Sequence, residues 1–232
     1  MSNGSGLFGD QSPLKPHLVR GTGGISGEIA DLRRDVLATV GPMVALTVDE
    51  FTDPVAADPD GIKLAVATVA AATTYSGAAL DGAVGAGAIS PPRNITVTTA
   101  GATPADAPAT ATINGTDING AVLSEVITVA QTATIALGLK AFASVTSIVL
   151  PAADGVAATL AFGFGDEIGL SKPIVTRAGL TSLTREIEAG VLVTTGVVTD
   201  ATVGAPNGTY LPATVADGAN DYAVYYEYDP SV

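Results

Sequence analysis

The chain has 232 residues, a formal charge of −13 and no cysteine. The surplus of carboxylates, 23 acidic against 10 basic side chains, repels phosphate backbones and argues against nucleic-acid binding. Without cysteine, disulfides and thiolate metal sites are excluded, and no unbroken run of about 20 apolar residues predicts a membrane span. Aromatic residues are only 5% of the chain, which favours closely packed sheets over an aromatic-lined ligand pocket.

Residues 1–24 are dense in glycine, proline and serine, a composition typical of extended or disordered chain. We therefore expect an extended N-terminal arm. The segment lacks a basic stretch followed by an apolar one, so we expect no secretory signal.

Residues 25–43 predict one short α-helix and a linker. Ser26 is a suitable N-cap, and Gly41 followed by Pro42 ends the pattern. Apolar residues recur at helical spacing between them, at Ile29, Leu32, Val36, Leu37 and Val40. A helix of about four turns is unstable alone, so this stripe must dock on its own domain or on other copies; one stripe does not separate the two.

Residues 44–175 predict a β domain, either a sandwich or barrel-like. Apolar residues at a period of two and many β-branched residues mark the strands, which we expect over residues 44–48, 62–72, 94–99, 122–129, 142–149 and 159–164. The residues expected on buried faces are Ile95, Val97, Leu123, Ile127, Val129, Leu160, Phe162 and Phe164. Glu125 is the exception on its face.

Turn residues separate these strands. Residues 49–61 contain two Asp-Pro pairs and predict a loop, and residues 114–120 contain Asn and Gly that suit a tight reversal. Residues 70–90 are nearly all small, which favours a strand packed closely on another backbone over a flexible connection.

Residues 176–232 predict a C-terminal β extension or small subdomain. Residues 189–199 indicate strands with a bulge near Gly196, and residues 206–208 predict a turn. Four of the six tyrosines lie within residues 221–229, with Tyr222 and Tyr226 on one face and Tyr225 on the other. They fit two interpretations equally: filling a sheet surface, or anchoring an interface.

We predict no catalytic, metal or cofactor site. His17, the only histidine, lies in the arm, away from any sheet. The acidic residues over 49–60 do not have the spacing of a calcium loop. Carboxylates at Asp117, Asp166 and Glu167 have no sequence relation that predicts a catalytic pair, and no glycine run has the dinucleotide-binding pattern.

Residues 80–166 resemble the virion structural proteins of tailed phages. The matching motifs are Leu80-Asp81-Gly82, Ser90-Pro91-Pro92-Arg93-Asn94-Ile95-Thr96-Val97, Asp106-Ala107-Pro108-Ala109-Thr110, Gly115-Thr116-Asp117-Ile118-Asn119-Gly120, Lys140-Ala141-Phe142 and Gly163-Phe164-Gly165-Asp166. The resemblance implies a β-rich, non-enzymatic protein of the phage particle, on the head as decoration or fibre, or in the tail.

We therefore expect a capsid decoration (cement) protein on the phage head surface, made in the host cytoplasm. Its expected partners are the major capsid protein and other copies of itself, with a trimer favoured, and neither nucleic acid nor membrane. The alternatives are a tail or head-fibre protein and a carbohydrate-binding adhesive β-sandwich. The predicted interface residues are Leu7, Phe8, Leu14, Leu18, Val19, Ile29, Leu32, Val36, Tyr222, Tyr225, Tyr226 and Tyr228.

Overall fold

Antiparallel strands make up most of the structure, a computed structural model that describes residues 44–174, 176–177, 180–181, 183–193, 196–200, 203–228 and 230. These residues belong to one unit, 44–232, whose curled sheets form a half-barrel. The predicted mainly β fold is confirmed. The predicted arm and helix, and with them the predicted interface residues from Leu7 to Val36, lie outside the described residues.

The larger sheet has nine strands. They are β2 (Asp58–Ala67), β3 (Thr73–Ser76), β4 (Ala88–Gly101), β5 (Thr110–Thr116), β6 (Val122–Thr128), β7 (Ile135–Leu150), β8 (Ala158–Gly169), β13 (Val197–Thr199) and β14 (Thr209–Leu211). The order is β13-β14-β8-β4-β7-β5-β6, with β2 also paired to β8 and β3 to β7. Two short 3₁₀ turns, Gly77–Ala79 and Pro104–Asp106, lie in its connections.

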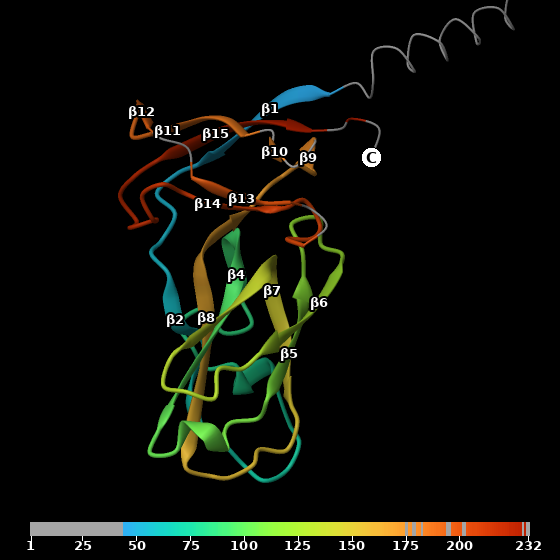
Figure 1. Cartoon of the computed structure of the whole chain (residues 1–232), viewed down its shortest axis with the longest axis vertical. Helices are drawn as coiled ribbons and strands as arrows, with labels where there is room; N and C mark the ends of the chain where they lie inside the picture. Colours follow the sequence, from blue (N-terminus) through green and yellow to red (C-terminus); the bar gives the residue numbers. More distant parts are fainter. Residues whose placement is uncertain are drawn as a thin grey trace, which may run out of the picture. The chain divides into compact units, whose positions relative to one another are not determined.

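A smaller, four-stranded sheet has the order β1-β15-β11-β12. Its strands are β1 (Ala45–Phe51), β11 (Leu183–Glu188), β12 (Val191–Val193) and β15 (Tyr222–Tyr228), and β9 (Thr176–Arg177) pairs separately with β10 (Leu180–Thr181). Because β1 pairs with β15 along its whole length, this sheet joins the beginning of the described chain to its end. Figure 1 shows β1, β15 and β11 crossing above β13 and β14.

Period-two alternation builds the core of the larger sheet. Ile95 and Val97 on β4, Phe162 on β8 and Phe142 on β7 are all fully buried, and they belong to one apolar cluster. All the side chains predicted for buried faces, from Ile95 to Phe164, are buried, so those predictions are confirmed. Such burial contributes roughly 1.5–3 kcal/mol for each large apolar side chain.

The hairpin between β5 and β6 turns where the sequence predicts a reversal. The Asp117 carboxylate accepts hydrogen bonds from the amides of Asn119 (2.7 Å) and Ala121 (3.0 Å). Gly120 adopts a φ of 77°, a conformation that glycine reaches without strain. Asp117 is therefore a turn residue, and its carboxylate is already bonded.

Two connections differ from the sequence prediction. Residues 49–61 are not one loop, because β1 continues to Phe51 and β2 begins at Asp58. The small-residue stretch 70–90 forms only the short strand β3 and part of β4. Its other residues make a turn in which Gly82 donates to the carbonyl of Ile62 (3.0 Å). Small side chains there do serve close backbone packing, as predicted, but mostly outside a strand.

The predicted bulge at Gly196 is also wrong, because Gly196 lies in the link that carries the chain from β12 in the smaller sheet to β13 in the larger one. A Cβ on Gly196 would lie 1.9 Å from the Leu211 carbonyl oxygen. The glycine therefore marks a close approach between two backbone segments. A glycine within a strand-like sequence can indicate either such an approach or a bulge, and the sequence alone does not distinguish the two.

Candidate functional site

The tyrosines of β15 divide between two environments according to the alternation of the strand. Tyr222 and Tyr226 are buried at 1% and 0% exposure, whereas Tyr225 and Tyr228 are partly exposed. The strand and its facing pattern are as predicted. The interface interpretation of Tyr222 and Tyr226 is wrong, because their rings fill the interior of their own chain and offer no surface to a partner.

The Tyr226 hydroxyl belongs to a buried hydrogen-bond network. It donates to the Asp49 carboxylate (2.9 Å) and accepts from the Lys172 amide (3.0 Å). The amide and the hydroxyl of Ser171 also donate to Asp49. Burial raises the pKa of Tyr226, so that it stays a donor. The network fixes β1 and β15 to the segment that follows β8.

Glu186 on β11 makes a second such link. Its fully buried carboxylate accepts from the amides of Gly196 (2.8 Å) and Ala213 (3.2 Å). Burial and then the nearby Glu186 carboxylate raise the pKa of the Tyr210 hydroxyl on β14. Because its oxygens are bonded to the backbone, Glu186 serves to join the two sheets.

The opposite side of the smaller sheet, which we call the outer face, carries apolar side chains toward solvent. Its residues alternate with the buried ones and come from β1 (Leu46, Val48, Glu50), β15 (Ala223, Tyr225, Glu227), β11 (Arg185, Ile187) and β12 (Leu192). Leu46 and Leu192 are 63% and 65% exposed. Exposed apolar groups gathered on one sheet face are typical of contact surfaces.

Sequence reasoning missed most of the outer face. In β1 the usual pattern is inverted: Asp49 points inward to Ser171 and Tyr226, while Leu46 and Val48 point outward. Only the pairing of β1 with β15 reveals this, because the alternation alone does not say which side is buried.

A hollow of about 330 Å³ lies on the larger sheet. It is lined by β2 and the residue before it, by β4, β7, β8 and β14, and by the segment after β14. The residues are Ala57, Pro59, Asn94, Thr96, Ile135, Leu137, Phe164, Gly165, Asp166, Glu167, Leu211 and Val215. Its carboxylates are already engaged: Glu167 accepts from the Thr209 hydroxyl (2.7 Å), and Asp166 lies 3.8 Å from the Arg93 guanidinium. The walls are mostly apolar.

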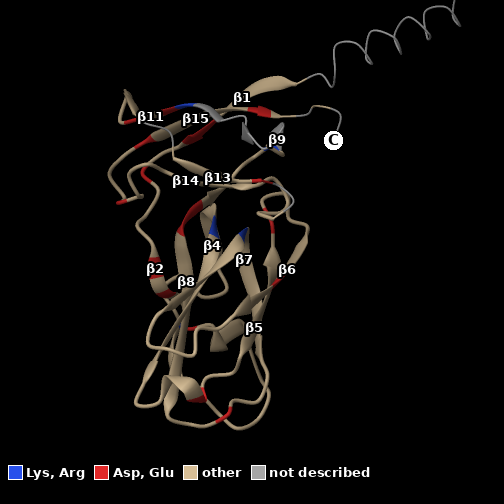
Figure 2. Ribbon diagram, in the orientation of Figure 1, with Lys and Arg blue, Asp and Glu red and all other residues tan. Residues whose placement is uncertain are grey.

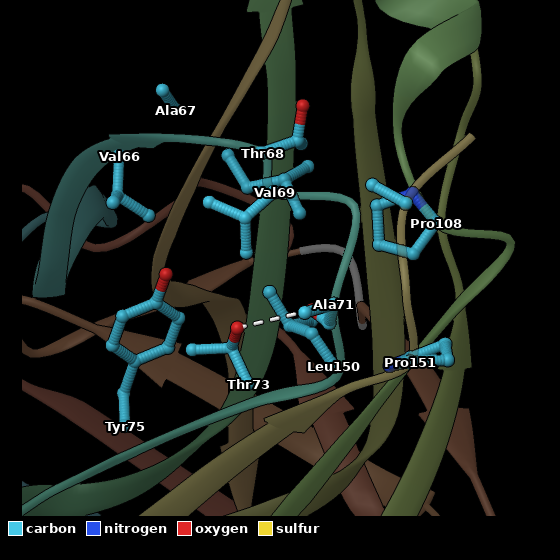
Figure 3. Close-up of a pocket in the computed structure, with 12 residues that line it drawn as sticks. Val66, Ala67, Thr68, Val69, Ala71, Thr73, Tyr75, Pro108, Leu150 and Pro151 are labelled. Carbon is cyan, nitrogen blue, oxygen red and sulfur yellow. Dashed lines mark hydrogen bonds between the residues drawn. The ribbon is translucent and has the colours of Figure 1, made fainter. Parts of the chain in front are cut away.

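A second hollow, between the β2–β3 connection and Leu150, is far smaller. Its volume is about 10 Å³, about that needed for one water molecule. Figure 3 shows apolar side chains around it, and the Thr73 hydroxyl donates to the Ala71 carbonyl at 3.2 Å. It has no room for a substrate.

Arg93 is the most deeply buried cation of the described residues, at 1% exposure. Its Nε donates to the Gly165 carbonyl (2.8 Å) and its Nη1 to the Val55 carbonyl (3.2 Å). Burial lowers the pKa of Arg93. Arg93 thus ties β4 to β8 and to the segment before β2.

Figure 2 shows carboxylates spread over the domain and few basic groups beside them.

The acidic residues over 49–60 do not converge. Asp49 is buried and bonded, Glu50 is exposed, and the pKa of Asp60 is raised, first by its hydrogen bond with Asp58. In the part of the chain that the structure describes, no three His, Cys, Asp or Glu side chains are placed to hold a metal ion. No helix among those residues is long and apolar enough to cross a membrane.

A scan against protein-family models finds no match, and neither do searches of curated proteins and of solved structures.

Proposed function

We propose that this chain is a capsid decoration protein of a tailed phage, which binds the outer head surface and stabilises the shell through residues 1–24. The observation that carries the proposal is the outer face of the smaller sheet, which leaves Leu46, Val48 and Leu192 exposed. Such a surface suits assembly, because a partner that covers the exposed apolar side chains removes them from water, and this stabilises the complex. The resemblance of residues 80–166 to phage particle proteins supports the same role.

In this role the major capsid protein is one partner, and other copies of the chain are the second. A specific interface ordinarily buries about 800 Å² on each partner. Residues 1–24 supply the contact with the major capsid protein, and the β domain faces outward from the shell. Repetition over the lattice then adds avidity to contacts that are weak singly.

The test is a comparison of two altered chains on particles stripped of this protein. One lacks residues 1–24, and the matched control carries a Gly/Ser segment of the same length in their place. We expect both to keep the β domain, as judged by circular dichroism, and both to lose most of their occupancy on particles. Full occupancy by either chain would refute the role of the arm.

Location on the particle is decided by chemical cross-linking of intact virions. Cross-links to the major capsid protein support the decoration role, whereas cross-links to tail proteins alone move the protein to the tail. The glycan-binding alternative would use Tyr222, Tyr225, Tyr226 and Tyr228 as rings that stack on a sugar. Two of these four, Tyr222 and Tyr226, are buried. A glycan array that detects specific binding by the full chain would restore it.

A further inference from the structure

The outer face is laid out in rows that run across the strands. The register places Val48, Tyr225 and Arg185 side by side on β1, β15 and β11. The next row on this side is Glu50, Ala223, Ile187 and Leu192. The Arg185 guanidinium lies 5.9 Å from the centre of the Tyr225 ring, so the cation sits over this face. The middle of the face is therefore aromatic and aliphatic, with charges around it.

Those charges are unevenly distributed across the sheet. The cation, Arg185, is on β11, whereas the anions, Glu50 and Glu227, are on β1 and β15. Consider a second copy related to the first by a 180° rotation about an axis that runs parallel to β15, midway between the two outer faces. The β1 strand of the second copy then lies over the β11 strand of the first. Each Arg185 then faces Val48 of the second copy and lies one row from its Glu50. Tyr225 meets Tyr225 at the axis, an arrangement that aromatic rings favour when offset. Glu227 is on the same strand and also meets its own counterpart there, one row from the Arg185 of each copy.

We infer that the outer face binds the outer face of a second copy, as a two-fold, sheet-on-sheet contact. The inference rests on the self-association in the proposed function and names its surface and symmetry. A contact in which the same patch meets itself is the ordinary basis of two-fold dimers. Two sheets pack at about 10 Å with strands nearly aligned, which brings the side chains of both faces together.

The size of the face sets the strength of the contact. Strands β1 and β15 have seven residues each, β11 has six and β12 has three. At about 4.8 Å spacing between strands and about 3.4 Å rise per residue, they give roughly 375 Å² on each copy. This is below the roughly 800 Å² per partner of a stable interface. The dimer therefore dissociates readily in dilute solution and is held firmly only where neighbouring copies are anchored side by side.

The test uses the full chain and two charge variants, Arg185→Glu and the double variant Glu50→Arg/Glu227→Arg. The first makes the charged groups of the face all negative and the second makes them all positive. In sedimentation equilibrium, we expect the wild type to dimerise reversibly and each variant alone to dimerise about ten-fold or more weakly, because like charges meet. An equimolar mixture of the two variants should form a heterodimer at least as tight as the wild-type dimer.

A matched control is Asp154→Arg, which reverses an exposed charge in the loop between β7 and β8 and should dimerise like the wild type. Circular dichroism of each variant checks folding. A wild-type chain that is monomeric at millimolar concentration overturns the inference. So does a trimer whose mass the variants leave unchanged, or a mixture that fails to associate. Because no particle is present, these outcomes are independent of whether the arm binds the shell.

Discussion

The two sheets are held by different forces. The buried cluster of the larger sheet consists of aliphatic residues and phenylalanine. The cluster under the smaller sheet is small, includes Tyr210 and Tyr226, and lies beside the carboxylates of Asp49 and Glu186. Apolar burial is non-directional and tolerant of small shifts, whereas each buried carboxylate must find its donors. The larger sheet is thus a self-sufficient core, and the smaller one is positioned on it by directional bonds.

The largest expected effect comes from the apolar core. Phe162→Ala should lower the free energy of unfolding by about 3–5 kcal/mol, because it removes a fully buried ring and leaves a cavity. Urea denaturation followed by circular dichroism measures this loss. The control, Val122→Ala, changes a side chain that is 89% exposed and should stay within about 0.5 kcal/mol. A loss below 1 kcal/mol for Phe162→Ala would mean that the larger sheet is not the main source of stability.

The next effect tests the polar attachment of the smaller sheet. Tyr226→Phe keeps the ring but removes the hydroxyl that Asp49 and Lys172 share. We expect a loss of about 1–3 kcal/mol, since a buried carboxylate loses a donor. The control is Tyr75→Phe on β3, whose ring is only half-buried. Equal stability of these two variants in the same denaturation experiment would contradict the importance of the Asp49 network.

This comparison explains how much of the molecule the sequence predicts. Strands β4, β6 and β8 are visible because their apolar residues alternate regularly, and the buried side of each is predicted correctly. The network under the smaller sheet is invisible because its partners are distant: Asp49 and Tyr226 are 177 residues apart. The outer face is hidden for the same reason, since which side of β1 is buried depends on a strand from the other end of the chain.

A smaller effect distinguishes paired from unpaired hydroxyls within the larger sheet. Thr96 is 4% exposed, and its hydroxyl makes no hydrogen bond to any residue that the structure describes. Thr68 is equally buried, but its hydroxyl donates to the carbonyls of Gly155 (2.9 Å) and Ala158 (3.2 Å). We expect Thr96→Val to stabilise by up to about 1 kcal/mol and Thr68→Val to destabilise by about 1 kcal/mol. Calorimetric melting of both variants checks the two opposite signs. Destabilisation by both would show that Thr96 has a partner.

The smallest effect is a change with pH, at a carboxylate that interrupts an apolar face of the larger sheet. Burial raises the pKa of Glu125, although the amides of Leu139 (2.7 Å) and Lys140 (3.3 Å) donate to it and partly oppose the shift. The folded chain therefore holds the Glu125 proton more tightly than the unfolded chain does. The stability that this proton confers is complete below the unfolded pKa and is lost as pH rises through the folded pKa.

Glu125→Gln cannot titrate, so its stability relative to the wild type should increase from about pH 4 to pH 7. The constant offset from the altered hydrogen bonds does not affect this slope. Free energies of unfolding of both chains, measured by urea denaturation across that range, give the difference directly. A difference that stays constant would mean that burial does not shift this carboxyl. A relative decrease would mean that the Leu139 and Lys140 amides outweigh burial, which would make Glu125 resemble the donor-satisfied carboxylates beneath the smaller sheet.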